Sequence, residues 1–311
     1  MIGSHLIEEL LKRGAQVRST MHAKHPLIRD ERVEYVQCDL TKREDCSAVV
    51  KDTDFVFLCA ANTSGAAVMA KNPIVHVTTN LLINSQVLEA ACLAGVERLL
   101  FVSSTTVYPA VQYAVKEEEA FVGDPHESYL GVGWMKRYIE KLAQFYCQRY
   151  GMKIALVRPT NAYGPYDKFD FETSHVLPAL IRRAVQKENP FEVWGDGTAV
   201  RDFIYVTDLA EGLLAALEHC ANGDAINMGS SQPVSIKEAV EITLKLTGHA
   251  DAKVVYDASK PTTIPVRIVD STKAKALLNF QPQVSFEEGM RRTIEWYRST
   301  CTLEGSKIEQ L

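Results

Sequence analysis

Short apolar runs alternate with longer amphipathic stretches along the amino-terminal half of the chain. The runs are rich in β-branched and aromatic residues and predict strands at residues 16–21, 33–38, 55–61, 99–103 and 154–158. Between the runs, apolar residues recur every three to four positions, which predicts helices, most clearly at residues 80–94. Because the run at 55–61 is continuous, we expect a strand buried on both faces. Alternating strands and helices predict an α/β fold with a doubly wound parallel sheet.

The alternation loosens after about Pro165. We expect residues 1–165 to form a dinucleotide-binding domain and residues 166–311 to form mainly a smaller substrate-binding lobe. Residues 202–220 read as a strand and a helix that return to the first domain.

The amino terminus is unusual for such a domain. Gly3 and the helical residues after it look like the third glycine of a G-x-x-G-x-x-G loop, where a pyrophosphate lies against a helix amino terminus. An ordinary helix start explains Gly3 equally well. Since the sequence shows no first strand and no earlier glycines of this loop, we expect a truncated first strand, from biology or a misassigned start codon, and weaker cofactor binding.

Composition narrows the possible partners. With 311 residues, 46% of them apolar, the chain can bury a large core. A net charge of −5 without any Lys/Arg-rich run argues against nucleic acid and anionic membranes. No apolar run is long enough to span a bilayer, and the first residues do not resemble a secretory signal. The cysteines are single, without CxxC spacing, which favours a reducing compartment, with the cytoplasm as default, and argues against a metal site.

Residues 104 and 136 suggest hydride-transfer chemistry. In the short-chain dehydrogenase pattern, a Tyr lies four residues before a Lys, one helical turn away on the same face. The ammonium lowers the pKa of the phenol, and a Ser hydroxyl from the preceding strand holds the substrate oxygen. Ser104 and Lys136 match this pattern, but Val132 occupies the Tyr position and can neither donate nor accept a proton.

Five ordered motifs extend this likeness over nearly the whole chain. They lie at residues 158–169, 174–183, 193–208, 226–229 and 257–261. With these motifs the chain resembles the extended short-chain dehydrogenase/reductase family of nucleotide-sugar epimerases, dehydratases and reductases. The resemblance implies a Rossmann fold and an NAD(P)-dependent enzyme that exchanges hydride at C4 of a nucleoside-diphosphate hexose or 4-keto-6-deoxyhexose.

The resemblance also implies roles for particular residues. Ser104 would polarise the substrate oxygen, and Lys136 would also hold the nicotinamide ribose. His175 matches the acid/base of epimerisation, whose usual cysteine partner is Thr106 here; His175 could equally cap the following helix. The cofactor-binding positions are Gly3, Asp39, Leu40, Ala60, Ala61, Asn80, Lys136, Pro159 and Asn161. The substrate-binding positions are Asn161, Arg183, Arg201 and Lys260.

Charge after the first strand bears on the choice of cofactor. Residues 17–24 contain Arg18 but no carboxylate, and basic residues suit a 2′-phosphate, so we expect NADP, with NAD possible. In this family the helices at 80–94 and around Lys136 pair across a twofold axis, which implies a homodimer.

Three functions remain open. The chain is an active epimerase or reductase in which Tyr129, Thr105 or water bypasses Val132, or it is a catalytically impaired relative that still binds nucleotide sugars. The third possibility is a structural or partner-binding Rossmann protein, against which the retained Ser104 and Lys136 argue.

Overall fold

The computed structural model describes residues 1–63, 65, 68, 71–260 and 262–303, so Pro261 of the fifth motif lies outside the described residues. The helices are α1 Ile2–Lys12, α2 Arg43–Val50, α4 Thr78–Ala94, α5 Leu130–Tyr150, α6 Val176–Val185, α7 Val206–His219, α8 Ile236–Thr247, α9 Thr272–Leu278 and α10 Phe286–Leu303. The strands are β1 Val17–Met21, β2 Val33–Gln37, β3 Phe55–Leu58, β4 Arg98–Val102, β5 Lys153–Pro159, β6 Asn161–Tyr163, β7 Phe191–Trp194, β8 Val200–Tyr205, β9 Ala225–Met228, β10 Pro233–Ser235, β11 Val254–Asp257 and β12 Val266–Arg267. Short 3₁₀ turns lie at η1 Pro73–His76, η2 Thr105–Val107, η3 Glu117–Phe121 and η4 Glu127–Tyr129.

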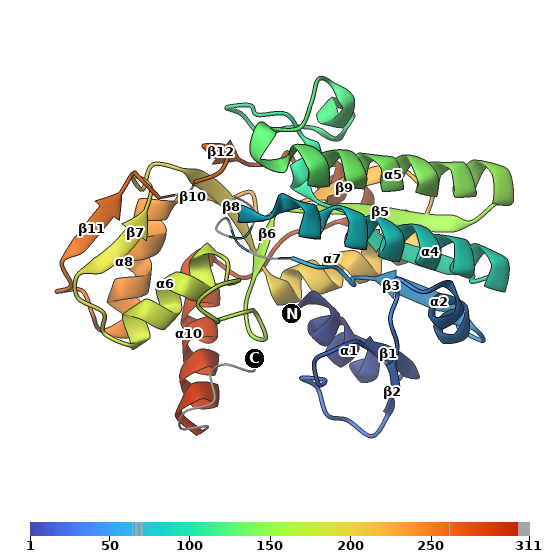
Figure 1. Cartoon of the computed structure of the whole chain (residues 1–311), viewed down its shortest axis with the longest axis horizontal. Coiled ribbons are helices and arrows are strands. Elements are labelled where there is room, and N and C mark those ends of the chain that lie inside the picture. Colours follow the sequence, from blue (N-terminus) through green and yellow to red (C-terminus); the bar gives the residue numbers. More distant parts are fainter. Residues whose placement is uncertain (64, 66–67, 69–70, 261, 304–311) are drawn as a thin grey trace.

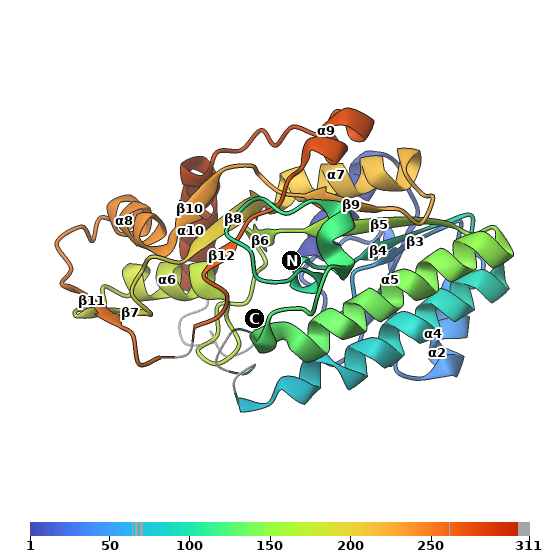
Figure 2. The ribbon, with the colours of Figure 1, turned by 90° about the horizontal axis from the view of Figure 1, so that it is seen from above.

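A four-stranded parallel sheet in the order β3-β4-β5-β9 forms the centre of the larger part (Figure 1). Successive side chains of a strand point to opposite faces. Leu99 and Phe101 therefore pack with α4 and α5, whereas Leu100 packs with α7 and α1 on the other face. Helices on both faces make this the doubly wound α/β fold that the sequence predicts, and Figure 2 shows α4 and α5 side by side along one face.

Two details of the sheets were not expected from the sequence. Strands β1 and β2 pair in parallel as a separate sheet, and in the described part of the chain β3 pairs only with β4. The expectation that residues 55–61 are buried on both faces is wrong, because β3 lies at the edge of its sheet and Phe55 is 48% exposed.

The carboxy-terminal part has its own core. Apolar residues of α6, α8, α10, β7 and β8 form a second buried cluster, separate from the two that cover the main sheet. Strand β8 pairs with β6, β10 and β12, so the strand of residues 202–220 joins this second sheet rather than the main one. Helix α7 packs on the main sheet, whose fourth strand is β9.

Candidate functional site

The side chain of Lys136 lies at the carboxyl end of β4. Its residue is only 7% exposed, and its Nζ donates a hydrogen bond to the Val102 carbonyl at 2.9 Å. The ammonium also lies 4.5 Å from the centre of the Phe101 ring. Ser104 follows two residues after Val102 and caps η2, where its Oγ accepts a hydrogen bond from the Thr106 amide at 3.2 Å. The structure thus brings Ser104 and Lys136 to the same edge of the sheet.

Burial changes the acidity of Lys136. Loss of hydration lowers its pKa from 10.5 to about 8, while the charges of Glu140 and Cys59 act in the opposite direction. A lysine with this pKa stays mostly charged at neutral pH and loses its proton at mildly alkaline pH.

Val132 lies one helical turn before Lys136 on α5, and it packs against the core that α4 and α5 share. Near it, the Thr106 hydroxyl is buried and has no hydrogen-bond partner among the described residues. Tyr129 lies at the start of α5, with the Arg267 guanidinium 4.1 Å from the centre of its ring. Neither Thr106 nor Tyr129 puts a phenol hydroxyl at the position of the Val132 side chain.

The loop after β3 carries Ala60 and Ala61, and α4 holds this loop in place. Asn80 is buried, accepts a hydrogen bond from the Asn62 amide at 2.7 Å and donates one to the Asn62 carbonyl at 2.9 Å. The side chain therefore fixes both polar groups of one loop peptide position directly after Ala61.

The residues predicted around β1 and β2 fall into two groups. Gly3 lies in the first turn of α1, and Asp39 and Leu40 follow the carboxyl end of β2, the edge at which such sheets bind ligands. The Asp39 carboxylate accepts hydrogen bonds from the Thr41 amide and hydroxyl, which lower its pKa.

Arg18 stays a prediction for the cofactor site. It lies at the amino end of β1, the opposite edge of the strand. Its guanidinium already donates to Glu34 at 2.7 Å and to the carbonyls of Val49 and Lys51. The basic residues that follow the carboxyl end of β1 are His22 and Lys24 instead.

Two predicted residues follow one another at the carboxyl end of β5. Pro159 ends β5, and Asn161 starts β6, where its Nδ2 donates to the Asp202 carbonyl at 3.0 Å. This hydrogen bond joins the main sheet to β8 of the second sheet at the level of the site.

His175 is the N-cap of α6, although its side chain makes no capping hydrogen bond. Loss of hydration lowers the pKa of His175 from 6.5. The charges of Lys168 and Arg267 lower this pKa further, whereas the charge of Asp167 raises it. Asp167 is buried and its pKa is raised, and its Oδ2 has no partner among the described residues. As a whole residue, His175 is exposed to solvent.

Two arginines lie beside each other where the sequence suggested only one. Arg201 on β8 and Arg267 on β12 are register partners in parallel strands, so their side chains leave the sheet on the same face. Arg201 is 9% exposed, and its pKa is lowered to about 10 by burial and then by the Arg267 charge. It donates to the carbonyls of Val200 and Pro265 and to the Thr263 hydroxyl.

Arg267 has a buried Nη2 without a hydrogen-bond partner, and no carboxylate pairs with either guanidinium among the described residues. Like charges directly opposite each other destabilise a sheet, so this pair fits a bound anion. Sequence reasoning missed Arg267, since nothing in the motifs indicates that β12 pairs with β8.

Arg183 and Lys260, the other predicted substrate residues, each have a carboxylate nearby. Arg183 donates to the Glu192 carbonyl at 2.6 Å and lies 3.6 Å from Glu188, while Lys260 lies 4.0 Å from Asp257. Their role with a substrate stays a prediction.

Within the described residues, no group of three or more His, Cys, Asp or Glu side chains could hold a metal ion. In the same part of the chain, no helix is both long and apolar enough to cross a membrane.

Comparisons with known proteins agree with this geometry. The sequence pattern of the NAD dependent epimerase/dehydratase family matches residues 1–229. The chain is 32% identical to GDP-L-fucose synthase of Sinorhizobium fredii (strain NBRC 101917 / NGR234) over 308 residues, 96% of this chain and 93% of the relative. It is 30% identical to dTDP-4-dehydro-6-deoxy-D-allose reductase of a Streptomyces species, again over 96% of this chain and 93% of the relative.

Among solved structures, the fold matches UDP-glucose 4-epimerase of Thermus thermophilus in complex with NAD. The TM-score is 0.84 at 26% identity, and the match covers 97% of each chain.

Proposed function

The chain belongs to the NAD dependent epimerase/dehydratase family, and from this premise we propose that it exchanges hydride between NADP(H) and C4 of a nucleoside-diphosphate hexose. Its relatives include nucleotide-sugar epimerases and reductases. The observation that carries the proposal is the buried ammonium of Lys136 at the carboxyl end of β4, beside Ser104. When bound, the nicotinamide supplies or accepts the hydride.

The residues of the predicted cofactor site fit a dinucleotide. Asp39 and Leu40 would contact the adenine, and the small side chains of Ala60 and Ala61 allow the pyrophosphate to approach a loop that Asn80 holds in place. Lys136 would donate to the nicotinamide ribose. His22 and Lys24, which follow β1 in a stretch without a carboxylate, favour the 2′-phosphate of NADP.

Arg201 and Arg267 would bind the diphosphate of the sugar nucleotide. Guanidinium groups donate to phosphate oxygens in pairs, and an anion between them would relieve the repulsion of two neighbouring cations. Asn161 would contact the sugar at the junction of the two sheets, and Arg183 and Lys260 remain candidates for the outer part of the substrate.

Proton transfer is the weak step of the proposed reaction. Ser104 and Lys136 can orient the substrate oxygen, His175 can exchange a proton beside a 4-keto group, and Thr106 replaces the second epimerisation group. Val132 cannot supply the proton that the C4 oxygen requires. Loss of a positioned general acid costs about 10²- to 10⁴-fold in rate, so we infer slow turnover.

Calorimetry with NADPH and with GDP tests the proposal. Both should bind the wild-type protein, and Arg267→Met should weaken GDP by at least about tenfold, since it removes a charge-assisted hydrogen bond. Arg13→Met changes an exposed arginine directly after α1 and is the matched control. If neither NADPH nor GDP binds, the structural or partner-binding alternative replaces this proposal; if both bind without turnover, the chain is the impaired relative.

We also propose a homodimer built from α4 and α5. These helices lie side by side on one face of the molecule (Figure 2). Both expose large apolar side chains. Exposed members are Leu82 and Leu93 on α4 and Trp134, Tyr138, Phe145 and Tyr150 on α5. The described cysteines Cys38, Cys46, Cys59, Cys92, Cys147 and Cys220 are free thiols, which fits the cytoplasmic location expected from the sequence.

A further inference from the structure

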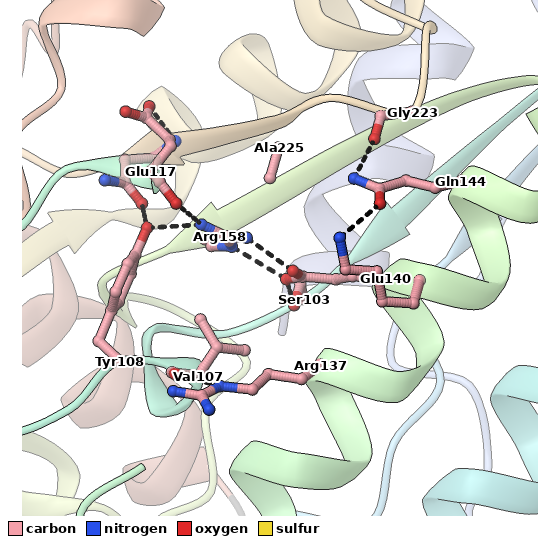
Figure 3. A network of polar contacts seen from close by, with 12 residues as sticks. Ser103, Val107, Tyr108, Glu117, Arg137, Glu140, Gln144, Arg158, Gly223 and Ala225 are labelled. Carbon is pink, nitrogen blue, oxygen red and sulfur yellow. Dashed lines mark hydrogen bonds and ion pairs between the residues drawn. The ribbon is translucent and has the colours of Figure 1, made fainter. Parts of the chain in front are cut away.

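A buried ion pair lies directly behind the candidate site. Arg158 on β5 and Glu140 on α5 have side chains that are 3% and 1% exposed. Arg158 Nε donates to one carboxylate oxygen of Glu140 at 2.9 Å and Nη2 donates to the other at 2.6 Å, so the contact is bidentate (Figure 3).

The ion pair is connected to three candidate site residues, Ser104, Lys136 and Pro159. Ser103, which precedes Ser104, donates its hydroxyl to Glu140 Oε1 at 2.5 Å. Glu140 lies four residues after Lys136, one turn along the same face of α5. Arg158 directly precedes Pro159. One carboxylate thus joins the segments that carry the serine, the lysine and the nicotinamide-side residues.

A second layer of hydrogen bonds holds the guanidinium. Arg158 Nη1 donates to the Tyr108 hydroxyl at 2.8 Å and to the Glu117 carbonyl at 2.9 Å, and Tyr108 donates to Asn227 on β9 at 2.5 Å (Figure 3). Replacing a buried ion pair by apolar residues is often neutral or stabilising, so stability alone gives little reason for this arrangement.

We propose that Glu140 and Arg158 are positioning residues, whose buried ion pair fixes Ser104 and Lys136 relative to each other and keeps the Lys136 side chain charged. The roles of Ser104 and Lys136 themselves rest on the proposed function. Glu140 and Arg158 need not contact the cofactor or the substrate. They act through Lys136 and, by way of Ser103, through Ser104.

The groups that face Lys136 define the test. From β4 the Phe101 ring and the Val102 carbonyl contact the ammonium, from the end of β3 Cys59 faces it, and on its own helix Glu140 is the nearby carboxylate. Burial lowers the pKa of Lys136, and Glu140 is the strongest influence in the opposite direction. Removing the Glu140 charge should therefore lower this pKa further.

The primary experiment measures the titration of Lys136 in the cofactor-free protein. Carbon-13 shifts of lysine Cε are followed against pH by NMR, and the Lys136→Arg spectrum identifies the signal. The double variant Glu140→Gln with Arg158→Met leaves no unpaired buried charge and should lower the pKa of Lys136 by about one unit. The matched control removes an exposed Arg–Glu pair, Arg13→Met with Glu211→Gln, and should leave the titration unchanged.

A second variant separates charge positioning from general loosening. Ser103→Ala removes one hydrogen bond from Glu140 but keeps the Arg158–Glu140 ion pair, so the charge beside Lys136 stays and the pKa of Lys136 should change little. General loosening of this region would shift the Lys136 titration in both variants. If the double variant does not fold, Glu140→Asp replaces it: this change draws the carboxylate back by one methylene and should lower the pKa of Lys136 by a smaller amount.

An unchanged titration of Lys136 in the folded double variant, or in Glu140→Asp if the double variant does not fold, overturns the proposal, as does an equal fall of this pKa in Ser103→Ala. Because the titration needs neither cofactor nor turnover, it is independent of the proposed function, which fails separately if NADPH does not bind.

Discussion

At the scale of single residues, the proposed hydride-transfer site lacks one proton donor. The side chain of Val132 offers two methyl groups one turn before Lys136, on the helix face where a phenol would meet the ammonium. The lysine that would lower the pKa of that phenol is present and buried, and its own pKa is lowered to about 8, so it stays mostly charged at neutral pH. The environment for an acid is therefore retained at a position that holds a hydrocarbon.

We predict that Val132→Tyr raises the rate of NADPH oxidation by at least about tenfold with a GDP- or dTDP-4-keto-6-deoxyhexose, because a positioned general acid contributes about 10²- to 10⁴-fold. Val132→Phe is the matched control, since it adds the ring without the hydroxyl and should give no gain. The measurement is the absorbance decrease of NADPH at saturating cofactor. Equal rates in the two variants, with NADPH still bound, would contradict the prediction.

Some site residues can be predicted from the sequence because their relation is local. Ser104 and Lys136 lie on consecutive elements, and four-residue spacing on a helix defines one face. Arg267 could not be predicted, since its position beside Arg201 depends on β12 pairing with β8 across the fold. The sequence shows that Arg18 is a basic residue near β1. It does not show at which end of β1 the residue lies, because that depends on where the strand begins.

At the scale of elements, α4 positions the loop after β3 rather than merely covering the sheet. Asn80 bonds the amide and the carbonyl of Asn62 and also donates to the His76 carbonyl at 2.8 Å. A short loop of small residues has little packing of its own, so its conformation depends on these three hydrogen bonds. The same segment would border the cofactor pyrophosphate.

We predict that Asn80→Ala weakens NADPH binding and lowers the free energy of unfolding by about 1–3 kcal/mol, because it removes three hydrogen bonds, one of them to the carbonyl of the buried His76. Asn84→Ala is the control: Asn84 is buried one turn further along α4, and its contact is a 3.8 Å hydrogen bond to Met135 Sδ. That variant should lose stability without losing cofactor affinity. Fluorescence titration with NADPH and urea unfolding measure the two effects, and the same loss of affinity in both variants would refute a specific role of Asn80.

At the scale of the whole molecule, the alternation of strands and helices was enough to predict the doubly wound sheet. Each expected strand formed within a few residues of its pattern, because β-branched runs and amphipathic helices are local properties. The sheet to which β8 belongs was not predictable, because β8, β10 and β12 pair over long sequence distances. The open edge of β3 likewise depends on its neighbours and not on its own apolar residues.

The exposed surface of α4 and α5 leads to a prediction about assembly. Tyr138 and Phe145 are 55% and 46% exposed two turns apart on α5, and the adjacent helix α4 exposes Leu82 and Leu93. Several large exposed apolar side chains on two packed helices are typical of a protein interface. We predict a dimer by sedimentation velocity at micromolar concentration, and a monomer for Tyr138→Glu with Phe145→Glu, because the new carboxylates would be buried without partners.

Leu277→Glu serves as the matched control, because Leu277 is 54% exposed on α9 and lies away from α4 and α5. It should leave the dimer intact. A wild-type protein that sediments as a monomer would contradict the dimer, and a Leu277→Glu variant that dissociates would place the interface elsewhere. Since Val132, Lys136 and Tyr138 share α5, a dimer built on this helix would also fix the element that carries the candidate lysine, so the double variant should bind NADPH less tightly than Leu277→Glu does.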